Sequence, residues 1–432
     1  MAIWACREDW SATEIAMPPD TPHHPTGPAV PEPPAAGPRV PSWRPEAWTG
    51  VVVRLVSTEA AGGVAMTAAV VVALVWSNLG GSYGAVWSHP LHWFAAPGLG
   101  TVRGWVNNAL MTLFFLGVGL EIGRERASGS LQGARNAVLP VVAATGGMIG
   151  AALAYLATVA ATGTWSVARG WGVPMATDVA FTLGAMALLG RRVPPALRVF
   201  VLALAVADDV GSVVVLAFVS STHLRPWALG AALAVLVLTV LLRRRVPVAW
   251  WPYLLALAAE WFLLAEAGVD PTLAGAFVGI AVPCAAAGRP SASGRLERPV
   301  APLSIIGVLP VFVLANAGVA FAGFVLGHGA RGVLIGILVA RLVGKTGGIA
   351  LAAALVVRFS ILELPSGVHW RQLVGAAALC GMGFTVPLLF AASAFAGETS
   401  LLDASRLGLL GGTVLALGLG GTVLTRTAEP HR

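Results

Sequence analysis

The sequence is poor in charged residues and in cysteine. Asp, Glu, Lys and Arg make up 11% of its 432 residues, against about 25% in an ordinary soluble domain. The three cysteines, Cys6, Cys284 and Cys380, lie far apart, with neither metal-ligand spacing nor a disulfide framework. The low content of charged residues excludes an ordinary soluble domain. The spacing of the cysteines indicates that they are structural, and we expect no bound cofactor.

The N-terminal region lacks an apolar run that could serve as the core of a signal peptide. Residues 1–50 are instead rich in proline and small polar residues, as in MPPDTPHHPTGPAVPEPPAAGP. This composition predicts a disordered cytoplasmic tail, in which His23 and His24 are solvated and bind no metal.

Long apolar runs fill the rest of the chain, which is 57% hydrophobic overall. Stretches of roughly 20 residues, enough to cross a hydrocarbon core of about 30 Å, recur without the alternation of a lipid-facing strand. We therefore predict an all-α, multi-pass protein of the lipid bilayer, with a transmembrane domain over 51–425 and a short cytoplasmic C-terminal tail over 426–432. The twelve expected spans lie near 58–78, 104–122, 137–160, 172–190, 196–220, 226–242, 249–267, 270–285, 302–326, 332–356, 369–396 and 402–424.

Arginine is distributed unequally between the two sets of predicted loops. With the N-terminus inside, the cytoplasmic connections carry fourteen arginines and the opposite ones five. Because cytoplasmic loops carry the excess of positive residues, we expect both termini in the cytoplasm of a plasma or inner membrane. The formal charge of +7 then reflects orientation, and no nucleic-acid partner is needed to explain it.

Two segments far apart in the chain resemble each other. AATGGMIGAALA occupies residues 143–154, and GKTGGIALAAAL occupies residues 344–355. The predicted spans place these segments in helices that enter the membrane from opposite sides. This is the inverted-repeat arrangement of many transporters.

Seven ionisable residues stand out within the predicted spans. A charge near the bilayer centre costs at least about 2.5 to 3.5 kcal/mol on insertion scales, so each needs a polar cavity, a partner or a function. We expect Glu260 and Glu266 to be structural. The other five are Asp178, Asp208, Asp209, Arg341 and Lys345.

The adjacent carboxylates of Asp208 and Asp209 lie in the middle of the fifth predicted span. Adjacent carboxylates repel, so at least one should bind a proton readily near neutral pH. When ionised, the same oxygens suit a hard cation such as sodium or lithium. One site that takes either a proton or a cation is the minimum that ion exchange requires.

Asp178 follows Pro174 and Thr177 in VPMATDVAFTLG, which indicates an interrupted helix. Asp178 could be a helix-capping residue, or it could neutralise helix-end dipoles beside the aspartate pair. In the second case the Thr177 hydroxyl would be a neutral ligand for the cation.

Lys345 is the only lysine among 27 basic residues. A buried lysine can release its proton, whereas arginine stays charged, so this position favours a titrating role. Arg341 precedes it by one helical turn and could face the same cavity or pair elsewhere.

An enzyme is not expected. The run DDVGS lacks the third aspartate of the DDxxD-like motif of intramembrane prenyltransferases, and no span carries the GxGD element of intramembrane aspartyl proteases. An open cation channel would collapse the proton gradient and gives the lone lysine no role. A sodium- or proton-coupled carrier of organic solutes is the alternative to ion exchange.

The motifs together resemble the NhaA-type sodium/proton antiporters. The matching stretches cover nearly all of residues 57–425: ALMTLFFLGVGLEIGRE, LPVVAATGGMIGA, ATDVAFTLGAMALLG, LALAVADDVG, GVDPTLAGAFVG, LPVFVLANAGV, LVGKTGGIAL and CGMGFTVPLLFAASAF. The resemblance implies exchange of cytoplasmic sodium or lithium for external protons, two protons per sodium, in pH and sodium homeostasis. It also implies interrupted fourth and eleventh helices that cross at mid-membrane, with GMGFT at 381–385 as the second break.

The resemblance also assigns roles to single residues. Asp208 and Asp209 match the pair that binds cations and protons, Thr177 and Asp178 match the broken fourth helix, and Lys345 matches the lysine of the tenth. Sodium would be held by Asp208, Asp209 and Thr177. Four further residues match positions of pH regulation at the cytoplasmic funnel: Glu121, Arg124, Glu125 and Glu297.

The sequence departs from the family at several positions. Asp270 stands where the family often has histidine, Asn108 where it has an aspartate, and Arg341 where it has an apolar residue. The connection at residues 80–100 matches the dimerising β-hairpin of the family in place but hardly in sequence. The resemblance still implies a homodimer.

Overall fold

The computed structural model describes residues 45–91, 99–128, 134–219, 224–243, 245–284, 291–321, 326–359, 363–365 and 367–427. Most of the predicted N-terminal tail, residues 1–44, and residues 428–432 lie outside the described part. The chain divides into two compact units, Met1–Leu55 and Val56–Arg432. The site and the packing described below belong to the second unit.

The described residues form helices and no β-strand, as expected for the all-α class. The elements, with π-helical and 3-10 segments labelled η, are α1 (Pro45–Asn78), α2 (Ser82–Trp87), α3 (Val102–Trp105), η1 (Val106–Leu110), α4 (Met111–Ser128), α5 (Ala134–Ala161), η3 (Trp165–Gly172), α6 (Val179–Leu188), η4 (Gly190–Arg192), α7 (Pro195–Val219), α8 (Pro226–Leu242), α9 (Trp251–Ala267), α10 (Leu273–Ala281), α11 (Ala292–Pro302), η5 (Leu303–Val308), α12 (Leu309–Asn316), α13 (His328–Val339), η6 (Ala340–Lys345), α14 (Thr346–Phe359), α15 (Trp370–Leu379), α16 (Thr385–Ala394) and α17 (Thr399–Thr427).

Seven helices of the described residues are long and apolar enough to cross a membrane. They correspond to seven of the twelve expected spans, and three of them contain a π-helical segment within one continuous helix (α3–η1–α4, α11–η5–α12 and α13–η6–α14). The other five expected spans correspond to shorter helices: α6, α8, α9, α10 and the pair α15 and α16. The chain is thus a helical membrane protein whose shorter helices include those on either side of the candidate site.

The ninth expected span is shifted in the structure. The helix runs from Ala292 to Asn316 instead of over 302–326. It begins where the Ser291 hydroxyl accepts a hydrogen bond from the Gly294 N–H at 3.2 Å, an N-cap that hydropathy does not reveal. It ends at Asn316, whose amide donates to Asn107 Oδ1 at 2.7 Å and to the Phe312 carbonyl at 2.9 Å.

The connection expected to form a β-hairpin contains the short helix α2 and one isolated antiparallel bridge between Pro90 and Thr101. Residues 92–98 lie outside the described part. Tyr83 anchors α2, because its hydroxyl donates to the Leu314 carbonyl at 2.8 Å and accepts from the Gly318 N–H at 3.0 Å. The described part of the expected hairpin therefore combines one short helix with an antiparallel pairing, in which the Leu91 N–H donates to the Gly100 carbonyl at 2.9 Å.

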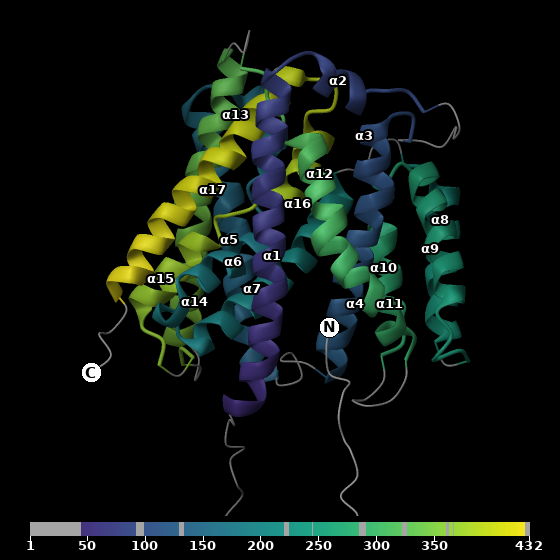
Figure 1. Cartoon of the computed structure of the whole chain (residues 1–432), viewed down its shortest axis with the longest axis horizontal. Helices are drawn as coiled ribbons and strands as arrows, with labels where there is room; N and C mark the ends of the chain where they lie inside the picture. Colours follow the sequence, from purple (N-terminus) through teal and green to yellow (C-terminus); the bar gives the residue numbers. More distant parts are fainter. Residues whose placement is uncertain are drawn as a thin grey trace, which may run out of the picture. The chain divides into compact units, whose positions relative to one another are not determined.

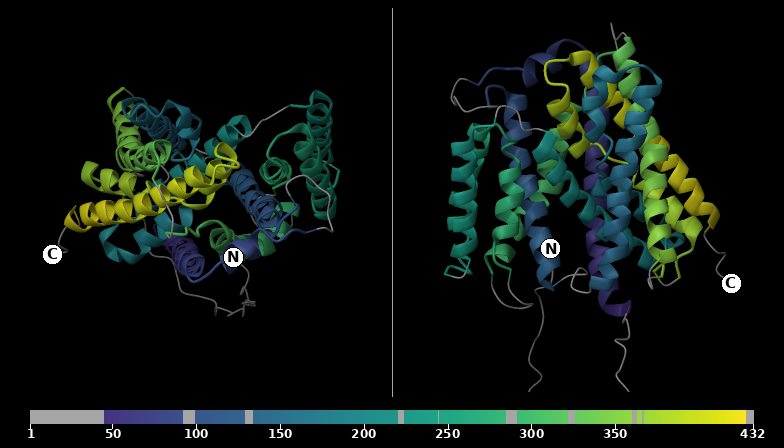
Figure 2. Two further views of the ribbon diagram at one scale, coloured as in Figure 1. Left: turned by 90° about the horizontal axis from the view of Figure 1, so that it is seen from above. Right: turned by 180° about the vertical axis from the view of Figure 1, so that it is seen from behind.

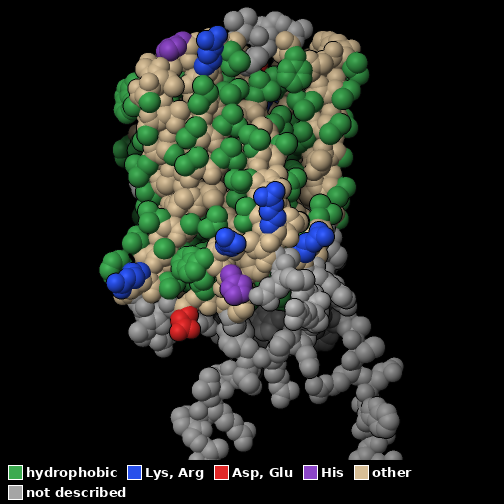
Figure 3. All heavy atoms as spheres, turned by 90° about the vertical axis from the view of Figure 1, so that its left-hand side faces the viewer, with side chains coloured by type: hydrophobic (Ala, Val, Ile, Leu, Met, Phe, Trp, Pro, Cys, Tyr) green, Lys and Arg blue, Asp and Glu red, His purple; other side chains and the backbone are tan. Residues whose placement is uncertain are grey.

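The helices of the second unit run largely side by side (Figure 1). In both views of Figure 2 the pair α8 and α9 lies at one edge, next to α10, and α13, α14 and α17 lie toward the opposite edge. On the face in Figure 3, hydrophobic side chains cover the middle, and basic side chains gather toward the ends. This pattern fits a surface that faces lipid between two aqueous layers.

The two repeat segments pack directly against each other, one in α5 and the other in η6 and α14. A Cβ added to Gly150 would lie 2.3 Å from the Gly344 carbonyl oxygen. A Cβ added to Gly348 would lie 2.2 Å from the Gly146 carbonyl oxygen. We call this glycine-lined surface the repeat contact; only residues without a side chain permit such an approach of two membrane helices.

Candidate functional site

The candidate site lies where two helices are interrupted. The first interruption, residues 173–178, separates η3 from α6, and we call it the first break. Pro174 cannot donate a backbone hydrogen bond, and Asp178, directly before α6, has an extended backbone with φ −99° and ψ 108°. The interruption predicted for the fourth span is therefore present at this position.

The second break, residues 380–384, separates α15 from α16. It coincides with the GMGFT motif and contains Gly381 and Gly383. A Cβ on Gly383 would lie 2.6 Å from the Ala176 carbonyl oxygen of the first break. Glycine at this position therefore lets the two breaks approach each other.

Hydrogen bonds join the two breaks. The Asp178 N–H donates to the Met382 carbonyl at 3.0 Å, and the Thr177 hydroxyl donates to the Cys380 carbonyl at 2.9 Å. Carbonyls that follow a helix end have no partner within the helix. In this protein groups from the opposite break provide their partners.

Asp208 of α7 is fully buried beside the first break. Its Oδ2 accepts two hydrogen bonds, from the Thr177 N–H at 2.7 Å and from Lys345 Nζ at 2.8 Å. Its Oδ1 is buried without a hydrogen-bond partner among the described residues. A carboxylate oxygen in this position is suited to bind a proton or a hard cation.

Lys345 is 1% exposed and forms a buried ion pair with Asp208. It also donates to the Met175 carbonyl of the first break. Burying two charges is expensive unless the geometry and further hydrogen bonds are good, and both conditions hold here. The sequence analysis assigned Lys345 to the same site as the aspartates, and in the structure Lys345 contacts Asp208.

Asp178 links the two helices that begin at the site. It directly precedes α6, and its Oδ2 accepts a hydrogen bond from the hydroxyl of Thr385, the first residue of α16, at 2.9 Å. A carboxylate beside helix N-termini interacts favourably with their dipoles. This position fits the dipole-neutralising role considered for Asp178.

Asp209 follows Asp208 on α7 and is half-buried. The carboxylate of Glu121 on α4 is close enough to act on it electrostatically. Glu121 also lies 3.8 Å from the Arg124 guanidinium, which contacts Glu297 at 3.0 Å. Three of the four residues expected in pH regulation thus form one cluster, and the side chain of Glu125 lies outside the described residues.

Three side chains of the site were not predicted in their observed roles. Thr385 bonds Asp178, Thr182 donates to the Leu379 carbonyl at 3.3 Å, and Arg341 donates to carbonyls of both breaks. A threonine at a helix start, as in GMGFT, is a usable sequence signal for Thr385. Thr182 and Arg341 donate to backbone carbonyls, and because every residue has a carbonyl, the sequence does not reveal these partners.

The remaining polar residues singled out from the sequence lie apart from this network. Glu266 pairs with Arg225 at 2.5 Å, and Asp270 accepts from Thr272. Asn108 donates to the Gly104 carbonyl at 3.0 Å. Glu260 is buried on α9, and its Oε2 has no hydrogen-bond partner among the described residues.

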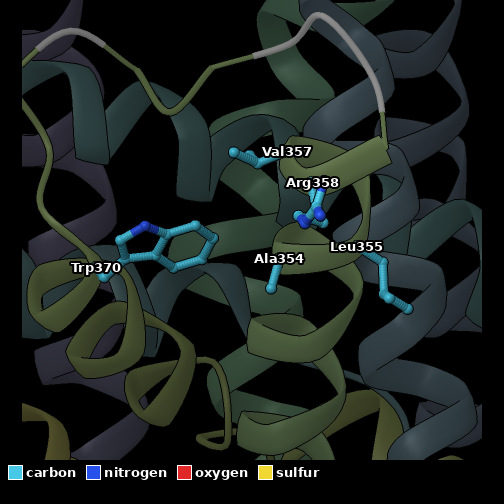
Figure 4. Close-up of a pocket in the computed structure, with 5 residues that line it drawn as sticks. All are labelled: Ala354, Leu355, Val357, Arg358 and Trp370. Carbon is cyan, nitrogen blue, oxygen red and sulfur yellow. The ribbon is translucent and has the colours of Figure 1, made fainter.

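A surface pocket at the end of α14 is not part of the candidate site. Figure 4 shows Trp370 facing the end of α14 across this pocket. The lining residues are Ala354, Leu355, Val357, Arg358 and Trp370, and none of them belongs to the network around Asp208.

Comparison with known proteins identifies a family for this chain. The family model described as Na+/H+ antiporter 1 matches residues 53–424. The chain is 40% identical over 385 residues to the Na(+)/H(+) antiporter NhaA 2 of Pseudomonas syringae pv. syringae, covering 88% of this chain and 95% of the relative.

Two further relatives are similar over comparable lengths. The Na(+)/H(+) antiporter NhaA 2 of Novosphingobium aromaticivorans is 39% identical, covering 89% of this chain and 98% of the relative. The Na(+)/H(+) antiporter NhaA of Shewanella loihica is 39% identical, and the match covers 84% of this chain and 94% of the relative. With a match over nearly all of its transmembrane domain, the chain belongs to the Na+/H+ antiporter 1 family.

Proposed function

We propose that this protein exchanges cytoplasmic sodium or lithium for external protons across the inner membrane, in pH and sodium homeostasis. The observation that carries the proposal is the environment of Asp208. One carboxylate oxygen is bound by Lys345 and by the Thr177 N–H, and the other is buried without a hydrogen-bond partner in the described part of the chain. The relatives are named as Na(+)/H(+) antiporters, which supports sodium/proton exchange.

The proposed mechanism is competition at one site that alternates between the two sides of the membrane. From outside, one proton neutralises a carboxylate of the aspartate pair and a second proton binds to and charges Lys345. After the site turns inward these protons leave, and sodium binds to Asp208, Asp209 and Thr177 before the loaded site returns. Because proton and sodium compete for the same oxygens, they cannot be carried together, and this exclusion couples their movements.

We further propose a stoichiometry of two protons per sodium. One net positive charge then moves inward in each cycle, so that a membrane potential drives sodium export with about 2.3 kcal/mol per 100 mV. The contact between two ionisable groups, Asp208 and Lys345, supports this stoichiometry. Glu121, Arg124, Glu125 and Glu297 would adjust activity to cytoplasmic pH.

The proposal includes the finer architecture implied by the sequence. It comprises twelve spans with inverted repeats, both termini in the cytoplasm, a homodimer, and two interrupted helices that cross at mid-membrane. The hydrogen bonds between the two breaks support the crossing. The packing of the two repeat segments against each other supports a common origin of the two halves.

Everted membrane vesicles provide the test. Asp208→Asn or Asp209→Asn should abolish sodium-dependent proton movement, because each removes a carboxylate charge from the exchange site. The matched control is Asp403→Asn, which changes an aspartate paired with Arg406 and should leave exchange within about twofold of the wild type. Retained exchange in both site variants would overturn the proposal.

Charge movement tests the stoichiometry separately. A sodium jump applied to protein on a supported membrane should produce a transient current across a series of pH values. A null current with transport intact would show electroneutral exchange. Sodium-dependent uptake of an organic solute in proteoliposomes, without proton exchange, would instead identify a solute carrier.

A further inference from the structure

Arg341 is a fully buried cation close to the exchange site. It lies in η6 with 1% of its surface exposed. The same π-helical segment ends at Lys345, so two cations four residues apart point toward the two breaks. A buried charge inside a membrane domain requires compensation, and the partners of Arg341 show what it does.

These partners are backbone carbonyls, one from each break. Nη1 donates to the Gly381 carbonyl at 2.8 Å, and Nη2 donates to the Ala176 carbonyl at 3.3 Å. Both carbonyls follow the C-terminal end of a helical segment, η3 in one case and α15 in the other. Buried backbone carbonyls outside a helix need a donor, and here one guanidinium supplies it to both breaks.

The space around Arg341 is shaped for this side chain. A Cβ on Gly383 would lie 2.8 Å from Nη2, and a Cβ on Gly412 of α17 would lie 3.1 Å from Cδ. The carboxylates that act on the guanidinium electrostatically are Asp178 at the start of α6 and Asp208 on α7. The planar fork of arginine can donate to two acceptors at once, which the single ammonium of lysine matches less well.

Arg341 and Lys345 therefore have different partners within one helical segment. Lys345 contacts Asp208, the proposed exchange carboxylate, in addition to one carbonyl. Arg341 contacts carbonyls of both breaks and stays charged, whereas lysine can give up its proton. We propose that Arg341 is a positioning residue that holds the two breaks together during the transport cycle. The part of this inference that concerns the cycle rests on the proposed function.

Three variants of the full chain test the inference: Arg341→Met, Arg341→Lys and, as a matched control, Arg406→Met. Arg406 also donates to a backbone carbonyl, that of Gly318, at 3.3 Å. The first measurement is the unfolding temperature of the purified protein in detergent across a pH series. The second is the initial rate of sodium-driven proton movement in proteoliposomes, as KM and maximal rate.

Arg341→Met should lower the unfolding temperature at every pH and reduce the maximal rate by about tenfold or more. Arg341→Lys should restore part of both at neutral pH and lose that part at alkaline pH, because the substituted lysine can be deprotonated. The control should leave the maximal rate within about twofold of the wild type.

Two results would overturn the inference. One is wild-type behaviour of Arg341→Met in both measurements. The other is a lysine variant that behaves like the methionine variant at every pH, which would show that shape and not charge matters; this comparison stays informative if Arg341→Met does not fold. If the wild type exchanges no ions but the unfolding data follow the expected pattern, the proposed function fails while the positioning role of Arg341 stands.

Discussion

The two breaks meet in one network but contribute different chemistry. The first break provides the side chains of Thr177 and Asp178, and its backbone binds Asp208. The second break has no ionisable side chain apart from the thiol of Cys380, and it contributes carbonyl groups and the absence of a side chain at Gly383. The difference indicates that loss of a polar group should damage the first break, whereas addition of atoms should damage the second.

Among variants of the two breaks, the strongest effect is expected for Asp178→Asn in the first break. Removing the charge of a buried carboxylate that accepts a hydrogen bond from Thr385 costs about 3 kcal/mol, which corresponds to about a hundredfold in rate if the transport step bears it. The measurement is the sodium-dependent proton flux in everted vesicles, with Asp403→Asn as the control. A flux within threefold of wild type, on the order of 1 kcal/mol or less, would remove Asp178 from the site.

Gly383→Ala should have the next largest effect, in the second break. The added Cβ would meet the Ala176 carbonyl oxygen at 2.6 Å, and overpacking of this kind costs about 1 to 3 kcal/mol. We expect a lower unfolding temperature and a flux reduced by about tenfold. Gly347→Ala is the matched control, because a Cβ there meets no atom within 4 Å. Equal behaviour of the two alanine variants would contradict the close approach of the breaks.

Thr385→Val tests the hydrogen bond that joins the start of α16 to Asp178 of the first break. The substitution keeps the shape of the side chain and leaves a buried carboxylate oxygen without its donor, at a cost of about 1 to 3 kcal/mol. The flux should fall by about fivefold, and Thr385→Ser should restore most of it. If serine and valine give the same flux, the hydroxyl has no role.

The smallest effect is expected for Cys380→Ala. Cys380 serves the site through its carbonyl, which accepts from Thr177, and alanine keeps that carbonyl. The loss of a small buried side chain should lower stability by about 1 kcal/mol and change the flux by less than about twofold. A tenfold loss would mean that the second break also acts through a side chain.

The sequence predicts the charged part of the site well. Asp208 and Lys345 stand out because ionisable residues are costly in apolar spans, and the structure places them 2.8 Å apart. Pro174 and GMGFT likewise predict where the helices are interrupted. These features can be predicted because they depend on the residue type, which the sequence gives directly.

The parts that the sequence misses depend on the backbone. The partners of Arg341 are carbonyls of Ala176 and Gly381, and every residue has a carbonyl, so no residue type marks these two. The helix from Ala292 to Asn316 is displaced from its predicted place for a similar reason: it begins at a cap that Ser291 forms with a backbone N–H. Hydropathy responds to apolar content and is insensitive to such local bonds.

The repeat contact has a consequence for how the protein responds to its bilayer. Where Gly150 meets Gly344 and Gly146 meets Gly348, the backbones of two helices touch, and the gap is too narrow for an acyl chain. Lipid cannot wedge these helices apart, so changes in acyl-chain composition should leave this contact unaltered. The pair α8 and α9, at the opposite edge in Figure 2, presents exposed Trp227, Leu233 and Leu255 and is the part on which bilayer thickness should act.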